Sequence, residues 1–485
     1  MQTHFPSGGG PDSGAGLLLT PFRAVRYDLS RVGELANVTS PPYDVIGPGT
    51  LERLRDASPY NVVKLILPAD APGAREPKGA PLSWTEEGGS EGRATERRGK
   101  DRGPERPEAS AASTAAARLR GWLAEGVLAV DDAPAFYVYE QRARGWVQRG
   151  LIGLVAVGTD AVHPHEGVMP GPVAGRQELM RETRSNLEPI LLVYNGGAAA
   201  GGHGGPAGLE GGLPGEHPSV PPGAASRLTD LTADRQAPLA SVATDDGVTH
   251  RLWAVTDPAT QAAISADLAT RTALIADGHH RYAAYRGLQA EMHASGLGAG
   301  PWDYGLAFLV DADAYPLRLG PIHRVLPRLD PAEAARLAAG AFTVTEVPCG
   351  AAMDRLAAAG ESGTAFLIAG HGRYWLLTAP DPRQVTAAMP PRSSPRWQAL
   401  DASVMQELLL AQLWSIEDNE RDVLISHDAD EAVRMATDCG GTAVISNPMP
   451  LAAVMDIAAH GEKVPRKSTS FGPKPRTGLV LRTFE

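Results

Sequence analysis

Strand-like and helix-like patterns of hydrophobic and polar positions alternate along most of the chain. Runs of β-branched and aromatic residues bounded by Gly, Pro or polar clusters predict strands, and apolar positions three and four residues apart predict helices. The predicted strands are 61–67, 136–140, 151–157, 190–194, 250–255, 273–276, 364–369, 373–378, 442–446 and 478–483. The predicted helices are 112–125, 175–187, 258–270, 280–296, 331–340, 351–359, 399–415 and 429–437. Because no regular strand–helix–strand rhythm emerges, the pattern predicts a mixed α/β (α+β) fold.

Two segments interrupt this pattern. Near 70–112 and near 196–226 the chain is rich in Gly, Pro and polar residues and poor in large apolar ones, so both are predicted to be disordered insertions. We therefore expect a flexible N-terminus over 1–18, a main α/β domain over 19–330 that carries both insertions, and a C-terminal α/β region over 331–485 that contributes a basic loop to the site.

Composition narrows the classes of function. The net charge of −11 makes general nucleic-acid binding a poor hypothesis, because such binding neutralises phosphates with Lys and Arg. No apolar run approaches the ~20 residues that span a bilayer, and the first residues lack the pattern of a signal peptide, so we expect a cytoplasmic protein with no membrane partner. Cys349 and Cys439 have no metal-type spacing and are predicted to be buried free thiols. The sequence does not indicate an oligomeric state.

The most distinctive polar segment is 277–282 (Asp-Gly-His-His-Arg-Tyr), between a short predicted strand and a predicted helix. Gly278 allows a tight strand-to-helix turn, and the start of a helix presents unpaired N–H groups and the positive end of its dipole. Two imidazoles and a guanidinium at this place predict an anion site, most simply for phosphate. A histidine there would also donate or accept a proton near neutral pH. The alternative is that Asp277 caps the helix and both histidines are surface residues.

A second polar segment, 163–166 (His-Pro-His-Glu), follows a predicted strand. Glu166 beside two imidazoles would act as a general base or as a metal ligand, and His163 and His165 would bind a metal if a third ligand joined them. A polar loop is the alternative. Further along, three arginines at i, i+5 and i+8 share roughly one helix face, as a phosphate clamp or as a solvated basic face: Arg176, Arg181 and Arg184.

Two loops supply further candidate ligands. Prolines at 41–42 predict a rigid extended turn that presents Asp44 to a ligand or a cation. The loop 466–474 is not a P-loop, but its lysines and hydroxyl groups suit phosphate oxygens: Lys467, Ser468, Thr469 and Lys474. A basic C-terminal loop without a ligand is the alternative.

Seven segments occur in an order that resembles one family: PFRA at 21–24, PPYDVI at 41–46, SPYNVVKL at 58–65, FYVYEQ at 136–141, HPHE at 163–166, ADGHHRY at 276–282 and KSTSF at 467–471. The resemblance is to the prokaryotic family known as domain of unknown function 1015, and it extends from about residue 20 to the end. The strand–turn–helix element at 273–296 is in turn similar to the signature box of the ParB/sulfiredoxin-like superfamily, which includes DNA-partition proteins, sulfiredoxins and free-serine kinases.

This resemblance implies a ParB/sulfiredoxin-like nucleotide-binding core with additional α/β elements. It implies that the turn faces nucleotide phosphates through Asp277, Gly278, His279, His280 and Arg281. The similarity to serine kinases implies that Glu166 is the base for a substrate hydroxyl.

Residues and resemblance together predict phosphoryl-transfer or phosphate-ester chemistry on a small hydroxylated metabolite, with serine or phosphoserine as the first candidate. Glu166 would orient or deprotonate the hydroxyl group or a water, Arg281 and Lys467 would hold phosphoryl oxygens, and His279 or His280 would donate a proton. The remaining predicted ligands are Asp44, His165, Arg184, Ser468 and Thr469. The expected cofactors are Mg²⁺, which accompanies phosphate substrates, and a nucleotide, ATP or ADP.

Two alternatives belong to other classes of protein. One is a non-catalytic nucleotide-binding regulator, in which the nucleotide drives a conformational switch. The other is a hydrolase or nuclease with a metal site at His163, His165 and His279.

Overall fold

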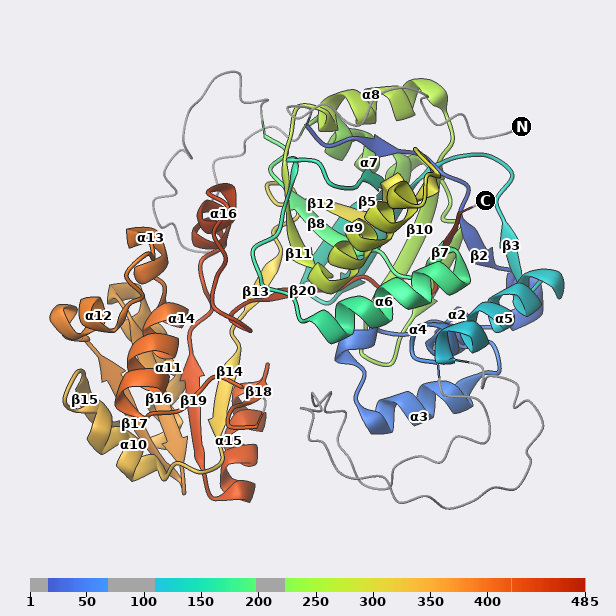
Figure 1. Ribbon diagram of the computed structural model, residues 1–485. Helices are drawn as coiled ribbons and strands as arrows, with labels where there is room; N and C mark the ends of the chain where they lie inside the picture. Colours follow the sequence, from blue (N-terminus) through green and yellow to red (C-terminus); the bar gives the residue numbers. More distant parts are fainter. Residues whose placement is uncertain (1–15, 69–109, 198–222, 420, 485) are drawn as a thin grey trace, which may run out of the picture.

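Two lobes, each organised around one large β-sheet, make up the computed structural model (Figure 1). It describes residues 16–68, 110–197, 223–419 and 421–484. Most of the predicted flexible N-terminus and most of both predicted insertions lie outside the described residues. The ends of the insertions are described, and helices already begin at Ala111 and at Ala224.

The first lobe contains a nine-stranded sheet with the order β6-β11-β8-β12-β5-β4-β10-β9, with β1 paired to β5. The pairs β6–β11 and β8–β12 are parallel and the others are antiparallel, so the sheet itself is mixed. The predicted mixed α/β fold is confirmed. Its strands are β1 (Leu19–Thr20), β4 (Phe136–Ala143), β5 (Trp146–Ala156), β6 (Val162–His163), β8 (Ile190–Tyr194), β9 (Ala240–Ala243), β10 (Thr249–Val255), β11 (Ala273–Asp277) and β12 (Tyr304–Asp311).

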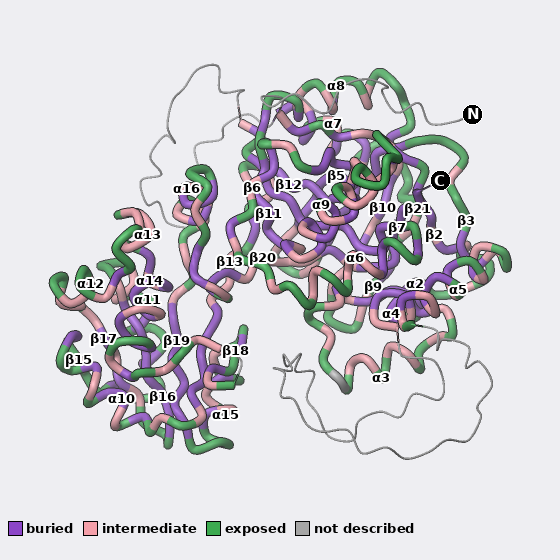
Figure 2. The backbone as a smooth tube through the Cα atoms, viewed as in Figure 1, coloured by how far each residue is buried: buried purple, intermediate pink, exposed green. Residues whose placement is uncertain are grey.

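Both faces of this sheet are covered, which Figure 2 shows as buried chain at the centre of the lobe. Successive side chains of a strand point to opposite faces, so Phe136 and Val138 enter one core while Tyr137 and Tyr139 enter the other. The helices of the lobe are α1 (Leu29–Val32), α2 (Leu35–Val38), η1 (Tyr43–Val45), α3 (Pro48–Ala57), α4 (Val63–Ile66), α5 (Ala111–Ala124), α6 (Pro170–Thr183), α7 (Ala224–Arg235), α8 (Pro258–Leu268), α9 (His279–Ala294) and η2 (Pro301–Asp303).

The second lobe contains a six-stranded antiparallel sheet with the order β15-β17-β16-β19-β14-β18. Its strands are β14 (His323–Leu326), β15 (Thr343–Val347), β16 (Ala365–Gly370), β17 (Arg373–Thr378), β18 (Leu424–Ser426) and β19 (Thr442–Ser446). Its helical elements, of which η4 is a π-helix, are α10 (Pro331–Ala338), η3 (Cys349–Ala351), α11 (Ala352–Ser362), α12 (Pro382–Ala388), α13 (Pro395–Gln398), α14 (Asp401–Ser403), η4 (Val404–Leu413), α15 (Ala429–Cys439) and α16 (Leu451–Ala459).

The chain crosses between the lobes twice and ends in the first one. Strand β13 (Arg318–Gly320) leads out and pairs with β20 (Ser470–Gly472) on the way back (Figure 1). The last residues then join the first lobe: β21 (Arg482–Thr483) pairs with β7 (Ser185–Asn186), and Leu481 bridges to Val25 of β2 (Val25–Tyr27), which itself pairs with β3 (Leu128–Val130). This return brings the loop 466–474 back to the first lobe.

Several sequence predictions are wrong in detail. The run 61–67 is not a strand, because Val63–Ile66 forms the helical turn α4, and the strand predicted over 478–483 shrinks to Arg482–Thr483. Helix α6 begins at Pro170 and ends at Thr183, earlier than predicted at both ends. Cys349 and Cys439 are exposed and not buried. Among the described residues, no helix is long and apolar enough to cross a membrane.

Candidate functional site

The turn between β11 and α9 has the geometry that its glycine predicts. Gly278 has φ of 93°, in the left-handed region that favours glycine. A Cβ atom there would lie 2.9 Å from Cγ2 of Ile190 and 3.0 Å from Nε of Arg281. The turn thus lets β11 end and α9 begin without a gap, and it leaves the first N–H groups of α9 at the site.

Replacing Gly278 by alanine is expected to destabilise the protein by about 1–3 kcal/mol, because the side chain would be strained and would press on Ile190 and Arg281. The matched control is Gly145→Ala, at φ of 82° in the β4–β5 turn, where an added Cβ atom would meet nothing within 4 Å. Chemical unfolding should show the larger loss at Gly278. Equal losses at both positions would contradict the close packing of this turn.

Asp277 does not cap α9, because its side chain belongs to a buried ion-pair network. Its carboxylate accepts a hydrogen bond from Arg281 Nη2 at 2.5 Å and lies 2.6 Å from Lys474 Nζ. Lys474 Nζ also donates to Asp44 Oδ2 at 2.6 Å, so one ammonium joins two carboxylates from distant parts of the chain. Burial raises the pKa of Asp277, whereas the charge of Lys474 lowers the pKa of Asp44 against the effect of burial.

The guanidinium of Arg281 faces inward from α9. Its Nη1 donates to the carbonyl oxygen of Pro189 at 2.7 Å, and only 2% of the residue is exposed. Beside it lies Glu188, which is 5% exposed and accepts from the N–H of Tyr43 at 3.1 Å. Arg176 lies 4.3 Å from the centre of the Tyr43 ring and 3.7 Å from Glu188. These charged side chains pack together against the inner side of the turn.

Three histidines line the site next to Glu166 and the loop 466–474. His279 Nδ1 lies 3.8 Å from Glu166 Oε2, and His279 Nε2 accepts from the backbone N–H of His165 at 3.4 Å. His165 Nε2 lies 2.9 Å from the Thr469 hydroxyl, and the rings of His165 and His279 meet edge to face at 4.5 Å. His280 Nε2 accepts from the N–H of Met169 at 3.1 Å. The segments 163–166, 277–282 and 466–474 therefore meet in space.

Burial keeps these imidazoles neutral near pH 7. It lowers the pKa of His279 well below its usual value, and it lowers the pKa of the neighbouring His165 to about 4. Because Nε2 of His279 accepts a hydrogen bond, the neutral ring carries its proton on Nδ1, on the side of Glu166. Burial raises the pKa of Glu166, against the charge and the backbone N–H of Lys467.

The unfolding free energy is expected to fall as the pH is lowered from about 6.5 to about 4. Burial depresses the pKa of His165, His250 and His323 to about 4, so the unfolded chain binds protons in this window that the folded chain does not. One such shift is on the order of 3 kcal/mol. His250 is the best position for a test, because it packs against Tyr139 and not against the turn. His250→Gln removes one of the depressed pKa values, so the unfolding midpoint should depend less on pH. An unchanged slope in this variant would contradict the assignment.

The loop 466–474 presents one exposed cation and two engaged hydroxyl groups. Lys467 is exposed, and its φ of 50° is rare for a residue with a side chain. Arg324, 2% exposed, fixes the loop by donating to the carbonyl oxygens of Lys467 and Arg466 at 2.8 and 2.9 Å. The hydroxyl of Ser468 donates to the Pro465 carbonyl oxygen at 2.6 Å.

Of the predicted basic face, only Arg176 reaches this site. Arg181 pairs with Glu291 of α9 at 3.4 Å, and Arg184 is the exposed left-handed residue that ends α6, where its carbonyl oxygen accepts from the Phe484 N–H. Within the described ranges, no group of three His, Cys, Asp or Glu is placed to hold a metal ion, so His163, His165 and His279 do not form such a group.

Sequence reasoning missed several members of this network. Glu188 precedes a strand and has no local pattern around it, and Arg324 lies at the start of the short strand β14. His427, in the second lobe between β18 and α15, is exposed, and the charges of Lys474 and Lys467 reach it, adding to the effect of burial in lowering its pKa. A charged residue next to a strand end was the one available signal for each of them.

The fold and this network define a mixed α/β protein with a buried, highly charged site at a strand–helix turn. The chain belongs to the family described as Protein of unknown function (DUF1015), which matches residues 19–82, 96–200 and 219–403. No curated protein matches the chain.

Three solved structures are distantly similar. A free serine kinase in complex with AMP has 15% identity and a TM-score of 0.31, over 64% of this chain and 84% of that chain. A conserved hypothetical protein from Pyrococcus furiosus has 15% identity and a TM-score of 0.31, over 67% and 92%. SbnI from Staphylococcus aureus, with a C-terminal truncation, has 11% identity and a TM-score of 0.34, over 68% and 87%.

Proposed function

We propose that this protein is an enzyme of phosphoryl-transfer or phosphate-ester chemistry on a small hydroxylated metabolite, with serine or phosphoserine as the first candidate. The observation that carries the proposal is the meeting of Glu166, the start of α9 and the loop 466–474 in one place. A carboxylate there lies within the influence of an exposed ammonium, Lys467, close to the start of a helix, whose first N–H groups favour anions. Phosphoryl chemistry needs this combination of a base and a fixed positive environment.

In this mechanism Glu166 takes the proton of the substrate hydroxyl or of a water. Burial raises its pKa toward the range in which a carboxylate both exists as a base and transfers protons efficiently. Lys467 and the N–H groups of α9 hold the phosphoryl oxygens. Burial and then the charge of Lys467 lower the pKa of His280, so its ring is neutral. Because Nε2 accepts from the N–H of Met169, the ring carries its proton on Nδ1, and this N–H would donate a hydrogen bond to the leaving oxygen.

The sequence predicts that Arg281 binds phosphate, but its guanidinium points inward, so we propose a positioning role for it. Both terminal nitrogens are engaged, with Pro189 and with Asp277, so in this proposal Arg281 positions the turn. Ser468 and Thr469 are proposed as positioning residues too. The hydroxyl of Ser468 bonds within its own loop, and the hydroxyl of Thr469 contacts His165.

A nucleotide and Mg²⁺ are the cofactors that this chemistry would use. Asp44 and Asp277 both accept from Lys474, so the site fits an ion that arrives on phosphate groups and keeps its own water, the usual behaviour of Mg²⁺. When bound, the ion would neutralise phosphate charge. Asp44 and Asp277 would face it through its water shell, and Glu166 would stay free to act as the base.

The direct test is turnover of purified protein with Mg²⁺ on phosphoserine alone, and on serine with ATP, ADP or pyrophosphate. We expect one of these reactions, and we expect Lys467→Met to lower its kcat/KM at least tenfold, because a charge-assisted contact to phosphate is lost. Arg434→Met, an exposed cation on α15, is the matched control and should keep full activity. Nucleotide binding without any turnover would support a regulator instead.

A further inference from the structure

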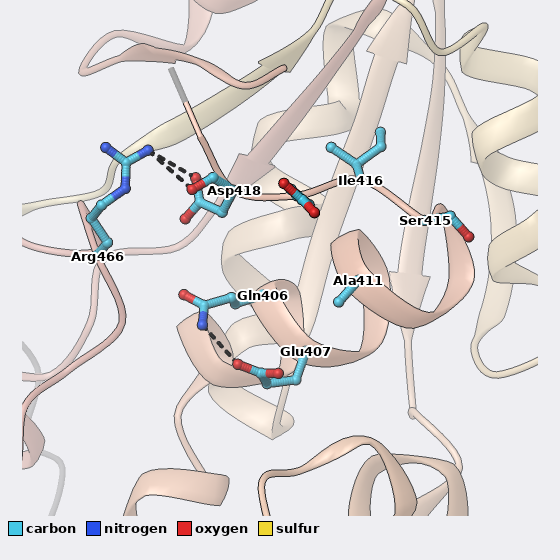
Figure 3. Close-up of a pocket in the computed structure, with 8 residues that line it drawn as sticks. Gln406, Glu407, Ala411, Ser415, Ile416, Asp418 and Arg466 are labelled. Atoms are coloured by element: carbon cyan, nitrogen blue, oxygen red, sulfur yellow. Dashed lines mark hydrogen bonds and ion pairs between the residues drawn. The ribbon is translucent and has the colours of Figure 1, made fainter. Parts of the chain in front are cut away.

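A cavity that is not part of the turn opens in the second lobe. It has a volume of about 550 Å³ and lies between the π-helix η4, the segment that follows it and Arg466 (Figure 3). This volume is within the usual range for sites that hold small molecules. Nothing in the proposed reaction uses this cavity.

The backbone around the cavity is unusual. Ten residues of η4 form a π-helix, a rare conformation that is often found at functional sites. Ser415, which lines the cavity, has φ of 53°, a strained conformation for a residue with a side chain. Both features shape one wall of the cavity.

The lining is strongly acidic. Glu407, Glu417 and Asp418 supply three carboxylates, and Arg466 supplies the one guanidinium. Arg466 Nη2 donates to Asp418 Oδ1 at 3.2 Å, which leaves an excess of negative charge on the wall. Gln406 donates to Glu407 Oε1 at 2.7 Å on the opposite side (Figure 3). Such a lining favours a ligand that carries positive charge.

The buried side chain of Asp418 gives a second indication of a ligand, separate from the acidic lining. Its side chain is only 9% exposed, and its Oδ2 has no hydrogen-bond partner within the part of the chain that the structure describes. A buried carboxylate oxygen without a partner is costly, and an N–H donor would relieve that cost. Asp418 lines the cavity, so a ligand there is positioned to supply the donor.

We infer that this cavity binds a small organic amine, a molecule with one or more primary ammonium groups. One ammonium would donate to Asp418, and Glu407 and Glu417 would receive a second or balance the charge across the cavity. The described residues contain no cluster of three acids or histidines arranged for a metal ion, which favours an organic cation over a bare one. The inference does not rest on the proposed reaction.

The cavity also reaches the loop of the first site. Arg466 directly precedes Lys467, and Arg324 holds the carbonyl oxygens of both residues. An ammonium on Oδ2 of Asp418 partly neutralises this carboxylate, which weakens its attraction for Arg466 on Oδ1 and thereby the anchor of this loop. The amine would therefore act as an effector of the loop 466–474.

Calorimetric titration of the full chain with 1,4-diaminobutane and with spermidine tests the binding. We expect saturable binding of at least one of them, weakened at least tenfold by Asp418→Asn and also weakened by Glu407→Gln on the other wall. Glu182→Gln, an exposed acid on α6, is the matched control and should bind as the unchanged protein does. No binding, equal binding by all variants, or displacement of the amine by an equal concentration of Mg²⁺ would overturn the inference.

Hydrogen exchange of the amides of 466–470 tests the effector role without any activity assay. Saturating amine is expected to change their exchange rate in the unchanged protein and not in Asp418→Asn. Binding with unchanged exchange would overturn the effector role, and the test stays informative if the proposed reaction is wrong.

Discussion

Glu166→Gln is expected to lower kcat about 10²–10⁴-fold while the protein stays folded, because the amide keeps the shape of the side chain but cannot take a proton. Glutamine also retains a group that can face His279, which lies 3.8 Å from the carboxylate. Steady-state kinetics on the reaction found for the unchanged protein measures the effect, and unfolding curves check the fold.

Glu182→Gln is again the control, since it makes the same chemical change on the exposed side of α6. The pH profile separates a base from a merely structural residue. With Glu166 present, kcat should fall as the pH drops through the raised pKa of this carboxyl, and that limb should be absent from the residual activity of the glutamine variant. Full activity in Glu166→Gln would refute the assignment of the base.

Lys474→Met is expected to destabilise the protein by about 3 kcal/mol, because it leaves the carboxylates of Asp44 and Asp277 without their shared cation. The loss should be smaller at low pH. Burial and the charge of Asp44 raise the pKa of Asp277, and without Lys474 it rises further, so acid neutralises this carboxylate in the folded variant. Chemical unfolding at several pH values measures both effects.

The double variant Lys474→Met with Asp277→Asn provides the control for this prediction. It removes the cation together with one of the two charges, so it should recover part of the stability that Lys474→Met loses at neutral pH. A loss that is independent of pH, and that Asp277→Asn does not reduce, would show that Lys474 acts through packing and not through its charge.

The sequence was sufficient to place the polar segments at the ends of elements. The strand before Asp277, the turn at Gly278 and the helix after it follow from a short apolar run, a glycine and helical spacing. The β4–β5 hairpin follows from two β-branched runs around Gly145. The mixed α/β fold follows from the absence of a regular alternation of strands and helices.

The remaining features depend on contacts between distant parts of the chain. The run 61–67 is rich in β-branched residues, but Val63, Leu65 and Ile66 are all fully buried in α4, so burial on every side removes the alternation that separates a strand from a helix. Lys474 meets Asp44 across 430 residues, because the chain returns from the second lobe. No local pattern encodes such a contact.

The inward direction of Arg281 has the same origin. Arg281 lies in the first turn of α9. The spacing of the segment 277–282 does not determine whether this guanidinium faces a ligand or the interior of the lobe. The carbonyl oxygen of Pro189, 92 residues earlier in the chain, decides it. Contrary to the prediction, Arg184 does not share a helix face with Arg176, because α6 ends one residue before it.

Phosphorus-31 NMR of the purified protein with Mg²⁺ tests whether the protein moves a phosphoryl group, since it follows every phosphate in the mixture at once. The samples contain serine with ATP, ADP or pyrophosphate, or phosphoserine alone, each with the unchanged protein and with His280→Ala. We expect one mixture to show a phosphate group moving to or from the hydroxyl oxygen, and we expect His280→Ala to slow this change strongly. Spectra that stay unchanged in every mixture, while a nucleotide still binds, would contradict this expectation.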